Sequence, residues 1–324
     1  MNVLVTGGAG YIGSHTCKAL ALAGHIPVVY DNLSMGHRWA VKWGPLVVGE
    51  LANQFAVEQA IVAHDIEAVV HFAARAYVGE SMQDPMLYFV NNSLATTCLL
   101  QAMMKCNVRK IVFSSTCATY GIPEQLPIDE SFQTRPVNPY GESKLAVENM
   151  LRWLGRLKGL NWIGLRYFNA AGADPDAEIG ELHDPETHLI PLALRAACPG
   201  DFLLQLFGTD YPTPDGTAIR DYVHVNDLAS AHVLALEKLN TQTVNDVFNL
   251  GTGKGISVFQ LLSTVSAIVG SDVRYVASPR REGDPPVLVA SADKVQRHLE
   301  WVPRYSAIEN IVRDAWNWEQ KKPT

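Results

Sequence analysis

Three glycines at three-residue intervals follow a short apolar run at the start of the chain, and this feature constrains the fold most strongly. The run Val3–Thr6 is typical of a buried strand, and Gly7, Gly10 and Gly13 separate it from a helix-compatible stretch. A turn this tight needs residues without a Cβ, so that the backbone can approach a pyrophosphate and the helix can pack on the strand. The N–H groups at the helix N-terminus favour phosphate. The pattern predicts a dinucleotide-binding unit; a purely structural glycine turn is the alternative.

Short apolar runs alternate with helix-compatible stretches through the first half of the chain. Strands that are apolar throughout and alternate with helices are typical of a parallel sheet covered on both faces. We therefore predict an α/β fold, a doubly wound parallel Rossmann-type sheet with a smaller mixed α/β substrate-binding lobe. The expected strands are Val3–Thr6, Pro27–Tyr30, Ala68–Phe72, Lys110–Ser115 and Trp162–Tyr167, and the expected helices include Ile12–Ala23, Asn53–His64, Leu94–Cys106 and Gly141–Leu157.

The texture of the sequence changes after Asn169. Residues 170–186 are rich in Gly, Asp, Pro and Glu, and residues 208–216 form a second turn-dense stretch. We interpret both stretches as irregular parts of a smaller lobe that closes over the carboxyl edge of the sheet. Residues 1–168 and 219–253 are thus expected to form the dinucleotide-binding Rossmann domain, and residues 169–218 and 254–324 the substrate-binding lobe.

Composition limits the classes of partner. Hydrophobic residues make up 48% of the chain and charged residues 18%, which is typical of a folded globular enzyme. The net charge of −7 argues against nucleic acid as a general partner, and no apolar run is long enough to span a bilayer. Five cysteines, an odd number without CxxC spacing, predict neither a disulfide framework nor a metal site. With no secretory leader pattern at its start, the chain is expected to be cytoplasmic.

A carboxylate after the second strand bears on the choice of cofactor. Asp31 follows Gly13 by 18 residues. At that position it would accept hydrogen bonds from the adenosine ribose hydroxyls and repel a 2′-phosphate, so NAD is expected rather than NADP. An N-cap or turn role for Asp31 is the alternative. Asn92 is a further cofactor candidate, but it lies in a helical stretch, where a buried amide that bridges backbone groups is a serious alternative.

A tyrosine and a lysine four residues apart supply the candidate catalytic pair. Tyr140 and Lys144 share one face of a helix that begins near Pro139. A nearby ammonium favours the phenolate, so we expect the pKa of Tyr140 to fall from ~10 towards the range of a general base. This spacing alone is common by chance. It becomes evidence for a catalytic pair because it follows the glycine turn. Thr116 ends a strand at the same sheet edge and is expected to hydrogen-bond the same substrate hydroxyl as Tyr140.

Several motifs together resemble one enzyme family. GGAGYIGSH, HFAA, VGES, FSSTCATYG, NPYGESK, LRYFNAAG, GTDYPTPDGT, RDYVHVNDLA and PRREGD are spread over nearly the whole chain. They resemble the UDP-glucose (UDP-galactose) 4-epimerases of the extended short-chain dehydrogenase/reductase superfamily. The resemblance implies an NAD-binding Rossmann domain, a nucleotide-sugar-binding lobe, and reversible epimerisation at C4 of a UDP-hexose through a 4-keto intermediate. Tyr140 would take the proton from the 4-hydroxyl while hydride moves to the nicotinamide, and Lys144 would also hold the nicotinamide ribose.

The same resemblance supplies most of the individual site residues. For NAD it implies Gly7, Gly10, Tyr11, Ile12, Gly13, Asp31, Asn32, Glu50, Leu51, Phe72, Ala73, Ala74, Asn92, Ser114, Tyr140, Lys144 and Tyr167. For the UDP-sugar it implies Thr116, Tyr140, Asn169, His188, Leu189, Gln205, Phe207, Arg220, Tyr222, Arg281, Asp284 and Leu288. Arginine forks pair bidentately with phosphate oxygens, so Arg220 and Arg281 could hold a diphosphate despite the acidic net charge. A surface ion pair is the alternative for each arginine.

Three positions depart from the family pattern. Arg75 stands near a position where relatives often carry a lysine close to the cofactor phosphates, and His188 stands where asparagine is frequent. A satisfied surface or core histidine is the alternative for His188. Leu288 occupies the position that sets room around the sugar C2 substituent. It is smaller than an aromatic residue and larger than Cys or Ser, so UDP-glucose and UDP-galactose should fit, and an N-acetyl sugar fits less readily.

Alternative functions stay open on the same scaffold. AYVGES with SSTCATYG also resembles UDP-arabinose/UDP-xylose 4-epimerases, and a UDP-N-acetylhexosamine 4-epimerase is a further alternative. A nucleotide-sugar dehydratase or decarboxylase is less favoured, because Cys117 and Ala118 cannot transfer the protons that dehydration requires. A non-catalytic NAD-binding sensor would be expected to lose the Tyr/Lys pair. The family also implies a homodimer, with the helices around Leu94–Met104 and Leu145–Leu157 as its interface.

Overall fold

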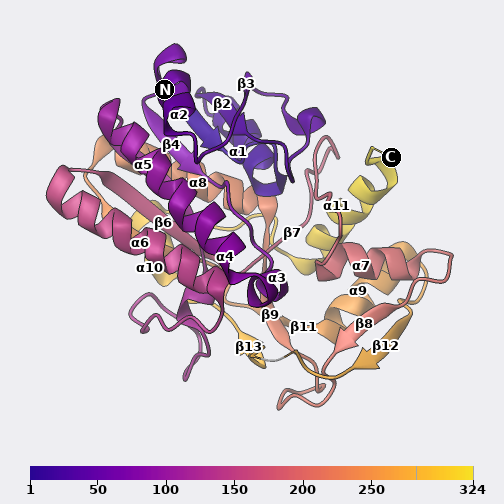
Figure 1. Ribbon diagram of the computed structural model, residues 1–324. Helices are drawn as coiled ribbons and strands as arrows, with labels where there is room; N and C mark the ends of the chain where they lie inside the picture. Colours follow the sequence, from indigo (N-terminus) through magenta and orange to yellow (C-terminus); the bar gives the residue numbers. More distant parts are fainter. Residues whose placement is uncertain (282, 324) are drawn as a thin grey trace.

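The computed structural model of the chain describes residues 1–281 and 283–323. Its larger part is a seven-stranded sheet with strand order β10-β6-β5-β4-β1-β2-β3 (Figure 1). Every neighbouring pair in this sheet is parallel. The strands are β1 (Asn2–Thr6), β2 (Ile26–Asp31), β3 (Leu46–Val48), β4 (Ala68–His71), β5 (Lys110–Thr116), β6 (Asn161–Tyr167) and β10 (Asn245–Leu250).

Helices cover both faces of this sheet, which confirms the predicted doubly wound architecture. Strand β1 shows why, because Val3 and Val5 pack into one buried cluster and Leu4 into another. Alternate side chains of a strand point to opposite faces, so a strand that is apolar throughout needs cover on both. The first face is covered by α1 (Tyr11–Leu22), α8 (Val225–Thr241) and α10 (Asp293–Leu299), the second by α2 (Gln54–Ala63), α5 (Ala95–Lys105) and α6 (Pro139–Lys158).

The smaller part of the molecule has its own core beside the carboxyl edge of the large sheet (Figure 1). Strand β9 (Ile219–His224) pairs with β7 (Asn169–Ala171), β11 (Gly255–Ser257) and β13 (Val287–Leu288), and β8 (Leu204–Phe207) pairs with β12 (Tyr275–Ser278). Helices α7 (Leu189–Ala197), α9 (Val258–Val269) and α11 (Ile308–Lys321) pack around this core. The short elements are η1 (Arg38–Ala40), α3 (Val78–Gln83), α4 (Pro85–Tyr88), η2 (Phe89–Leu94) and η3 (Cys117–Tyr120).

The strands read from the sequence all occur, and two further strands complete the sheet. Strand β3 has three residues at the sheet edge, and β10 begins with the polar pair Asn245-Asp246, so neither carries a long apolar run. The predicted helix Leu94–Cys106 begins as a π-helical stretch, η2, and continues as α5 from Ala95. The domain boundaries stay a prediction. In the structure β9 pairs within the smaller part, whereas α10 packs on β10 and α8. No helix among the described residues is long and apolar enough to cross a membrane.

Candidate active site

The glycine turn after β1 is closed so tightly that side chains cannot enter it. Gly7 has φ +71°, and a Cβ there would lie 2.6 Å from the backbone nitrogen of Ala73 in the loop after β4. A Cβ on Gly13 would lie 2.2 Å from the carbonyl oxygen of Gly7. Gly10 is the N-cap of α1 and has no side chain that could cap the first N–H groups of the helix. The turn therefore leaves helix N–H groups available to an anionic group, as the sequence indicates.

Replacing Gly13 tests this turn directly. We expect Gly13→Ala to lower the affinity for NAD at least about tenfold and to cost about 1–3 kcal/mol of unfolding free energy, because the methyl group must push α1 away from the turn. Calorimetric titration with NAD and thermal unfolding would measure the two effects. Gly79→Ala is the matched control, because a Cβ at Gly79 meets nothing within 4 Å and the glycine does not have a positive φ. Equal NAD affinity in both variants would contradict a cofactor role for the turn.

Asp31 ends β2 beside the glycine turn and is buried. Its Oδ2 accepts a hydrogen bond from the Ala9 N–H at 3.0 Å, and its Oδ1 accepts from the Leu33 N–H at 2.8 Å. Burial raises the pKa of Asp31, although these N–H donors act in the opposite direction. The carboxylate thus organises the turn and the following loop. This is the turn role that the sequence left open, and contact with an adenosine ribose stays a prediction.

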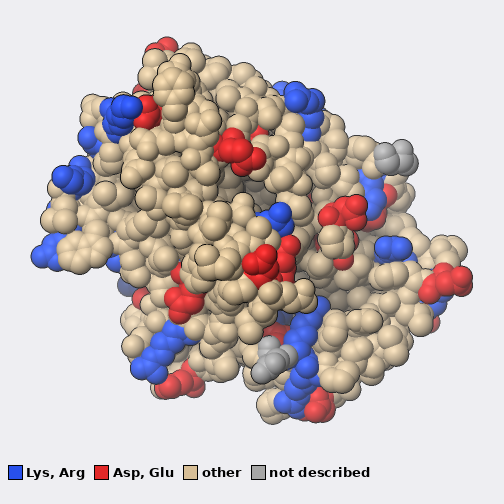
Figure 2. Space-filling view, viewed as in Figure 1, with Lys and Arg blue, Asp and Glu red and all other residues tan. Residues whose placement is uncertain are grey.

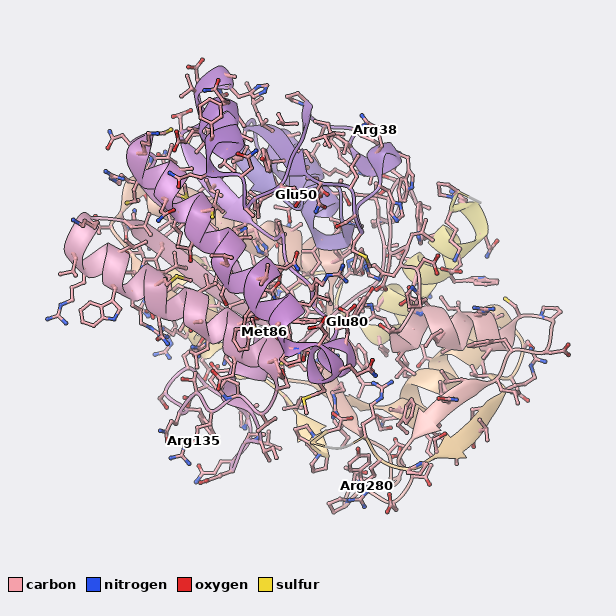
Figure 3. The ribbon with its side chains drawn as sticks, in the orientation of Figure 1. Arg38, Glu50, Glu80, Met86, Arg135 and Arg280 are labelled. Carbon is pink, nitrogen blue, oxygen red and sulfur yellow. The ribbon has the colours of Figure 1, made fainter. Side chains whose placement is uncertain are left out.

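Two further predicted cofactor residues lie near the same edge. The Nδ2 of Asn32 donates to both carboxylate oxygens of Glu50 at 3.1 Å. Glu50 is exposed, and Figure 3 places it beside the strands of the large sheet. The side chain of Leu51 is buried in the core cluster that contains Leu4. A contact between Leu51 and a cofactor would therefore be made by the Leu51 backbone. Ile12 packs against the opposite cluster.

The loop after β4 is held by a buried amide. Asn92 accepts from the Arg75 N–H at 2.8 Å and donates to the Arg75 carbonyl at 3.0 Å and to Ser143 Oγ at 2.9 Å. This is the bridging role that the sequence offered as an alternative to cofactor binding. The amide fixes the loop that carries Phe72, Ala73 and Ala74 at the turn. The Arg75 guanidinium pairs with Glu80 at 3.1 Å, and Glu80 lies near the centre of the molecule (Figure 3).

The candidate catalytic residues converge at the carboxyl end of β5. Thr116 ends that strand, and Tyr140 and Lys144 lie in the first turns of α6, whose N-cap Asn138 accepts from the Gly141 N–H at 2.8 Å. Pro139 follows this cap and pre-organises the helix start. Lys144 is 4% exposed, and its Nζ donates to the Ser114 carbonyl at 2.9 Å. Cap, proline and buried lysine together fix the phenol beside the strand end.

The pKa shifts in this group correct one expectation. Burial raises the pKa of Tyr140 to about 12, and the Thr116 hydroxyl pulls it in the opposite direction. Burial also lowers the pKa of Lys144 to about 7. The predicted fall in the Tyr140 pKa is therefore wrong for the protein by itself, because burial of the phenol dominates and the Lys144 ammonium donates to the Ser114 carbonyl. A catalytic phenolate therefore requires further positive charge at this site.

The end of the next strand completes the edge. Tyr167 lies opposite Thr116 in the β5–β6 register, and its hydroxyl hydrogen-bonds the hydroxyl of Ser114. Burial raises the pKa of Tyr167. His71, at the end of β4, lies 2.6 Å from Thr6 Oγ1 and 2.8 Å from Thr96 Oγ1, and burial lowers its pKa to about 3. The ends of β1 and β4 are thus joined by one side-chain hydrogen bond, and the ends of β5 and β6 by another.

The cations predicted for a diphosphate lie on the smaller part of the molecule. Arg220, on β9, donates to Asp284 at 2.5 Å and to the Ile219 carbonyl at 2.8 Å. The Arg281 guanidinium lies 4.2 Å from the centre of the Phe207 ring. Arg280 instead pairs with Asp210 at 2.7 Å and lies at the outer end of this lobe (Figure 3). Acidic and basic side chains gather around a hollow where the two parts of the molecule meet (Figure 2).

The remaining predicted substrate residues are distributed over the same lobe. Asn169 lies beside Tyr222 in the β7–β9 register, and Tyr222 is buried in the lobe's core. Gln205 is exposed on β8. Leu288, on β13, packs against a small cluster that also receives Cys117, the residue after Thr116. Leu288 and Cys117 thus pack on the same cluster. The substrate roles of these residues stay predictions.

His188 belongs to a cluster of histidine and glutamate side chains that the sequence did not predict. It is the N-cap residue of α7, directly before Leu189, and its Nδ1 hydrogen-bonds Glu181. His183 Nδ1 lies 3.1 Å from the same carboxylate oxygen. Burial would raise the pKa of Glu181, but the two imidazoles lower it to about 2. The sequence does carry a signal for this cluster, because two histidines and two glutamates fall within eight residues. The composition of the stretch, however, predicts a turn-rich loop.

Comparison with known proteins yields one family. The NAD dependent epimerase/dehydratase family matches residues 3–251. A protein of Halalkalibacterium halodurans named UDP-glucose 4-epimerase is 47% identical over 100% of this chain and 97% of its own length. A crystal structure of UDP-glucose 4-epimerase from Brucella ovis in complex with NAD superposes with a TM-score of 0.95, at 49% identity, covering 98% of this chain and 97% of that one. A UDP-glucose-4-epimerase from Stenotrophomonas maltophila, with bound NAD and formylated UDP-arabinopyranose, reaches 0.95 at 40% identity, covering 99% and 98%.

Proposed function

Because the chain belongs to the NAD dependent epimerase/dehydratase family, we propose that Tyr140, Lys144 and Thr116 carry out its reaction. The chain is an NAD-dependent enzyme of the UDP-glucose 4-epimerase kind, which interconverts UDP-galactose and UDP-glucose through a 4-keto intermediate. The pentose, N-acetylhexosamine and dehydratase alternatives are not favoured by these relatives. The observation that carries the residue assignment is the convergence of the Tyr140 phenol, Thr116 and the buried lysine at one strand end, at the same sheet edge as the glycine turn.

The residues of the turn fit NAD. Gly7 and Gly13 form a cradle that a Cβ would fill, and the Asp31 carboxylate at the end of β2 suits a ribose without a 2′-phosphate. In this proposal the pyrophosphate lies against the N-terminus of α1, and the loop Phe72–Ala74 borders the cofactor. Bound NAD supplies the acceptor and donor of the sugar's C4 hydride, and its cationic nicotinamide adds positive charge.

Each catalytic residue has a task that its surroundings support. The Tyr140 oxygen takes the proton of the sugar 4-hydroxyl during oxidation and returns it during reduction. Thr116 orients that hydroxyl, since its own hydroxyl lies near enough to the phenol to act on the pKa of Tyr140. The Lys144 ammonium stabilises the phenolate, because charges act strongly in a site from which water is largely excluded. Oxidation and re-reduction of C4 use the same three residues, so no second acid/base pair is needed.

The smaller lobe is proposed to bind the UDP group. Arg220 and Arg281 would contact the diphosphate with their guanidinium forks. Arg220 is now paired with Asp284, so diphosphate binding would exchange one anionic partner for another. Residues 169–218 and 254–324 would form this nucleotide-sugar lobe, and residues 1–168 and 219–253 the NAD domain. Leu288 packs on the same small cluster as Cys117, the residue after Thr116, and we propose that it limits bulk around the sugar ring.

The decisive experiment is a direct conversion. The purified enzyme is mixed with UDP-galactose, and UDP-glucose is measured through NADH formed by a coupled UDP-glucose dehydrogenase. Conversion of UDP-galactose is expected in this assay. The coupled dehydrogenase reports only UDP-glucose, so conversion of UDP-glucose, and the slower conversion expected of UDP-N-acetylgalactosamine and UDP-arabinose, is measured by chromatographic separation of the epimers. A protein that binds NAD and UDP yet converts neither hexose nucleotide would refute the proposal.

A homodimer through α5 and α6 accompanies this proposal. An apolar groove of about 720 Å³ runs between the two helices. Its lining includes Leu100, Met104, Met150 and Trp153, and Trp153 is 59% exposed. A contiguous apolar groove on a surface usually marks an interaction site. The second copy of the chain is the proposed occupant, with α5 and α6 of both copies forming a four-helix contact.

Charge placed in this groove should separate the copies. We expect Trp153→Glu to change the mass in solution from twice the 35.6 kDa of the chain to that of one chain, because a carboxylate cannot be buried there unpaired. Light scattering after size-exclusion chromatography measures the mass. Tyr275→Glu, on exposed β12, is the control and should leave the mass unchanged. A wild-type protein that elutes at the mass of one chain would remove the dimer proposal.

The five cysteines, all within the described residues, are free. Free thiols persist in a reducing compartment, which supports a proposed cytoplasmic location.

A further inference from the structure

The loop from Glu181 to His188 brings together the side chains of Glu181, His183, Glu186 and His188, here called the 181–188 cluster. One potential ligand atom from each of the four lies within 4.8 Å of all the others. We propose that this cluster is a binding site for one divalent cation of the Zn²⁺ type. The proposal goes beyond the epimerase reaction, which uses none of the four side chains for proton or hydride transfer.

The donor atoms have the right chemistry and spacing for zinc. Imidazole nitrogen and carboxylate oxygen are the ligands that Zn²⁺ takes at about 2.0–2.2 Å, with four in tetrahedral order in structural sites. Tetrahedral bonds of that length separate neighbouring ligand atoms by roughly 3.3–3.5 Å. His183 Nδ1 lies 3.1 Å from Glu181 Oε1 and 3.8 Å from Glu186 Oε2, and His188 Nδ1 lies 3.7 Å from Glu186 Oε1. Small side-chain shifts would bring all four atoms to one centre.

The hydrogen bonding of His183 points to the same centre. Its Nδ1 is buried and makes no hydrogen bond within the described residues, although Glu181 Oε1 is only 3.1 Å away. The nitrogen is thus close to the carboxylate without the alignment that a hydrogen bond needs. The Nδ1 atoms of both imidazoles lie close to the same oxygen of Glu181. A cation placed between the two Nδ1 atoms and this Glu181 oxygen would be coordinated by all three atoms. It would also give the buried His183 nitrogen a partner.

The ligand set suits a divalent cation. One divalent cation bound by two neutral imidazoles and two carboxylates gives a site of zero net charge. A ligand set of two imidazoles and two carboxylates suits zinc better than Mg²⁺ or Ca²⁺, which prefer oxygen ligands alone.

The surroundings of the cluster are built to hold its ligands. The Glu181 carbonyl accepts from Trp318 Nε1 of α11 at 2.8 Å, and Glu186 Oε1 accepts from the N–H groups of Thr187 and His188 at 2.7 and 2.8 Å. The ring of Tyr77, from the loop after β4, lies edge-on 5.9 Å from the His183 ring. A metal here would tie His188, at the start of α7, to the preceding residues Glu181, His183 and Glu186. It would also fix the orientation of the His188 ring.

Metal binding itself is the test. The untagged protein, stripped with a chelator and dialysed, is titrated with ZnCl₂ in a calorimeter, and bound zinc is counted by mass spectrometry after gel filtration. We expect one equivalent per chain, a higher Tm with zinc, and the visible d–d bands of a tetrahedral nitrogen-ligated ion when Co²⁺ replaces zinc. Glu181→Gln and His183→Gln should each weaken zinc binding by at least about 100-fold, since even residues behind the ligands change affinity 10–100-fold.

Two controls separate the site from general effects. Asp184→Asn removes an exposed carboxylate from the same loop, and His298→Gln removes an exposed histidine elsewhere. Both should bind zinc as the wild type does. A wild-type chain with native circular dichroism that takes up no stoichiometric zinc and gives no tetrahedral Co²⁺ spectrum overturns the proposal, as do ligand variants that bind zinc with unchanged affinity. Because zinc binding is read without substrate, this outcome is independent of whether UDP-galactose is converted.

Discussion

The Tyr140→Phe variant is expected to lose about 10³-fold in kcat for conversion of UDP-galactose to UDP-glucose. The change removes only the phenolic oxygen, which we propose takes and returns the proton of the 4-hydroxyl. The ring keeps its packing against Tyr88, whose ring centre is 6.2 Å away. Because burial raises the pKa of Tyr140 to about 12, its hydroxyl is uncharged in the free protein. The substitution therefore removes no charge from the folded chain. The variant should therefore fold normally and retain NAD.

The measurement is a coupled assay beside a determination of bound NAD in the heat-released nucleotide. Tyr275→Phe, at an exposed position on β12, is the matched control and should keep full activity. A Tyr140→Phe enzyme that retains a tenth or more of the wild-type kcat would contradict the assignment of Tyr140 as the acid/base group. Loss of bound NAD along with activity would instead assign the tyrosine to cofactor binding.

The parts of the fold that the sequence predicts are those that rest on local rules. The glycine turn is one such part of the fold. Gly7 and Gly13 leave no room for a Cβ, so their spacing in the sequence indicates the turn directly. The strands β1, β4, β5 and β6 are others, since each carries a run of apolar residues that pack into the core clusters on both faces of the sheet. Strand β3 escapes this rule because it lies at the sheet edge, where its three residues are only partly buried or exposed.

The side-chain roles that sequence could not decide depend on partners distant in the chain. Whether Asn92 faces a cofactor or a backbone is set by Arg75 and Ser143, which lie 17 and 51 residues away. The pKa of Tyr140 depends on how completely the site is desolvated, which no spacing encodes. The 181–188 cluster is local in sequence, yet its loop looked irregular, and only folding turns both histidines towards one carboxylate.

The Lys144→Met variant is the second expected large loss, about 10²-fold in kcat at pH 7. Methionine nearly matches the length of the lysine stem, so it removes the ammonium with little change in volume. The ammonium is the charge on this chain that we propose stabilises the Tyr140 phenolate. Because burial already raises the pKa of this phenol, removal of that charge makes the phenolate still harder to form. Lys158→Met, exposed near the end of the same helix, is the control.

The pH dependence distinguishes this electrostatic role from mere packing. The pKa of Lys144 is lowered from 10.5 to about 7, so its charge is present below pH 7 and is lost as the pH rises through about 7. The wild-type kcat should therefore fall on the alkaline side, and Lys144→Met should lack that limb. Between pH 7 and 10.5 the unfolded chain binds the extra proton, so wild-type stability should rise with pH there, and the variant should lose this rise. Titrations of kcat and of Tm from pH 6 to 10 test both. An alkaline limb that survives unchanged in the variant would mean that another group titrates, and the charge of Lys144 would then have no part in the proton transfer.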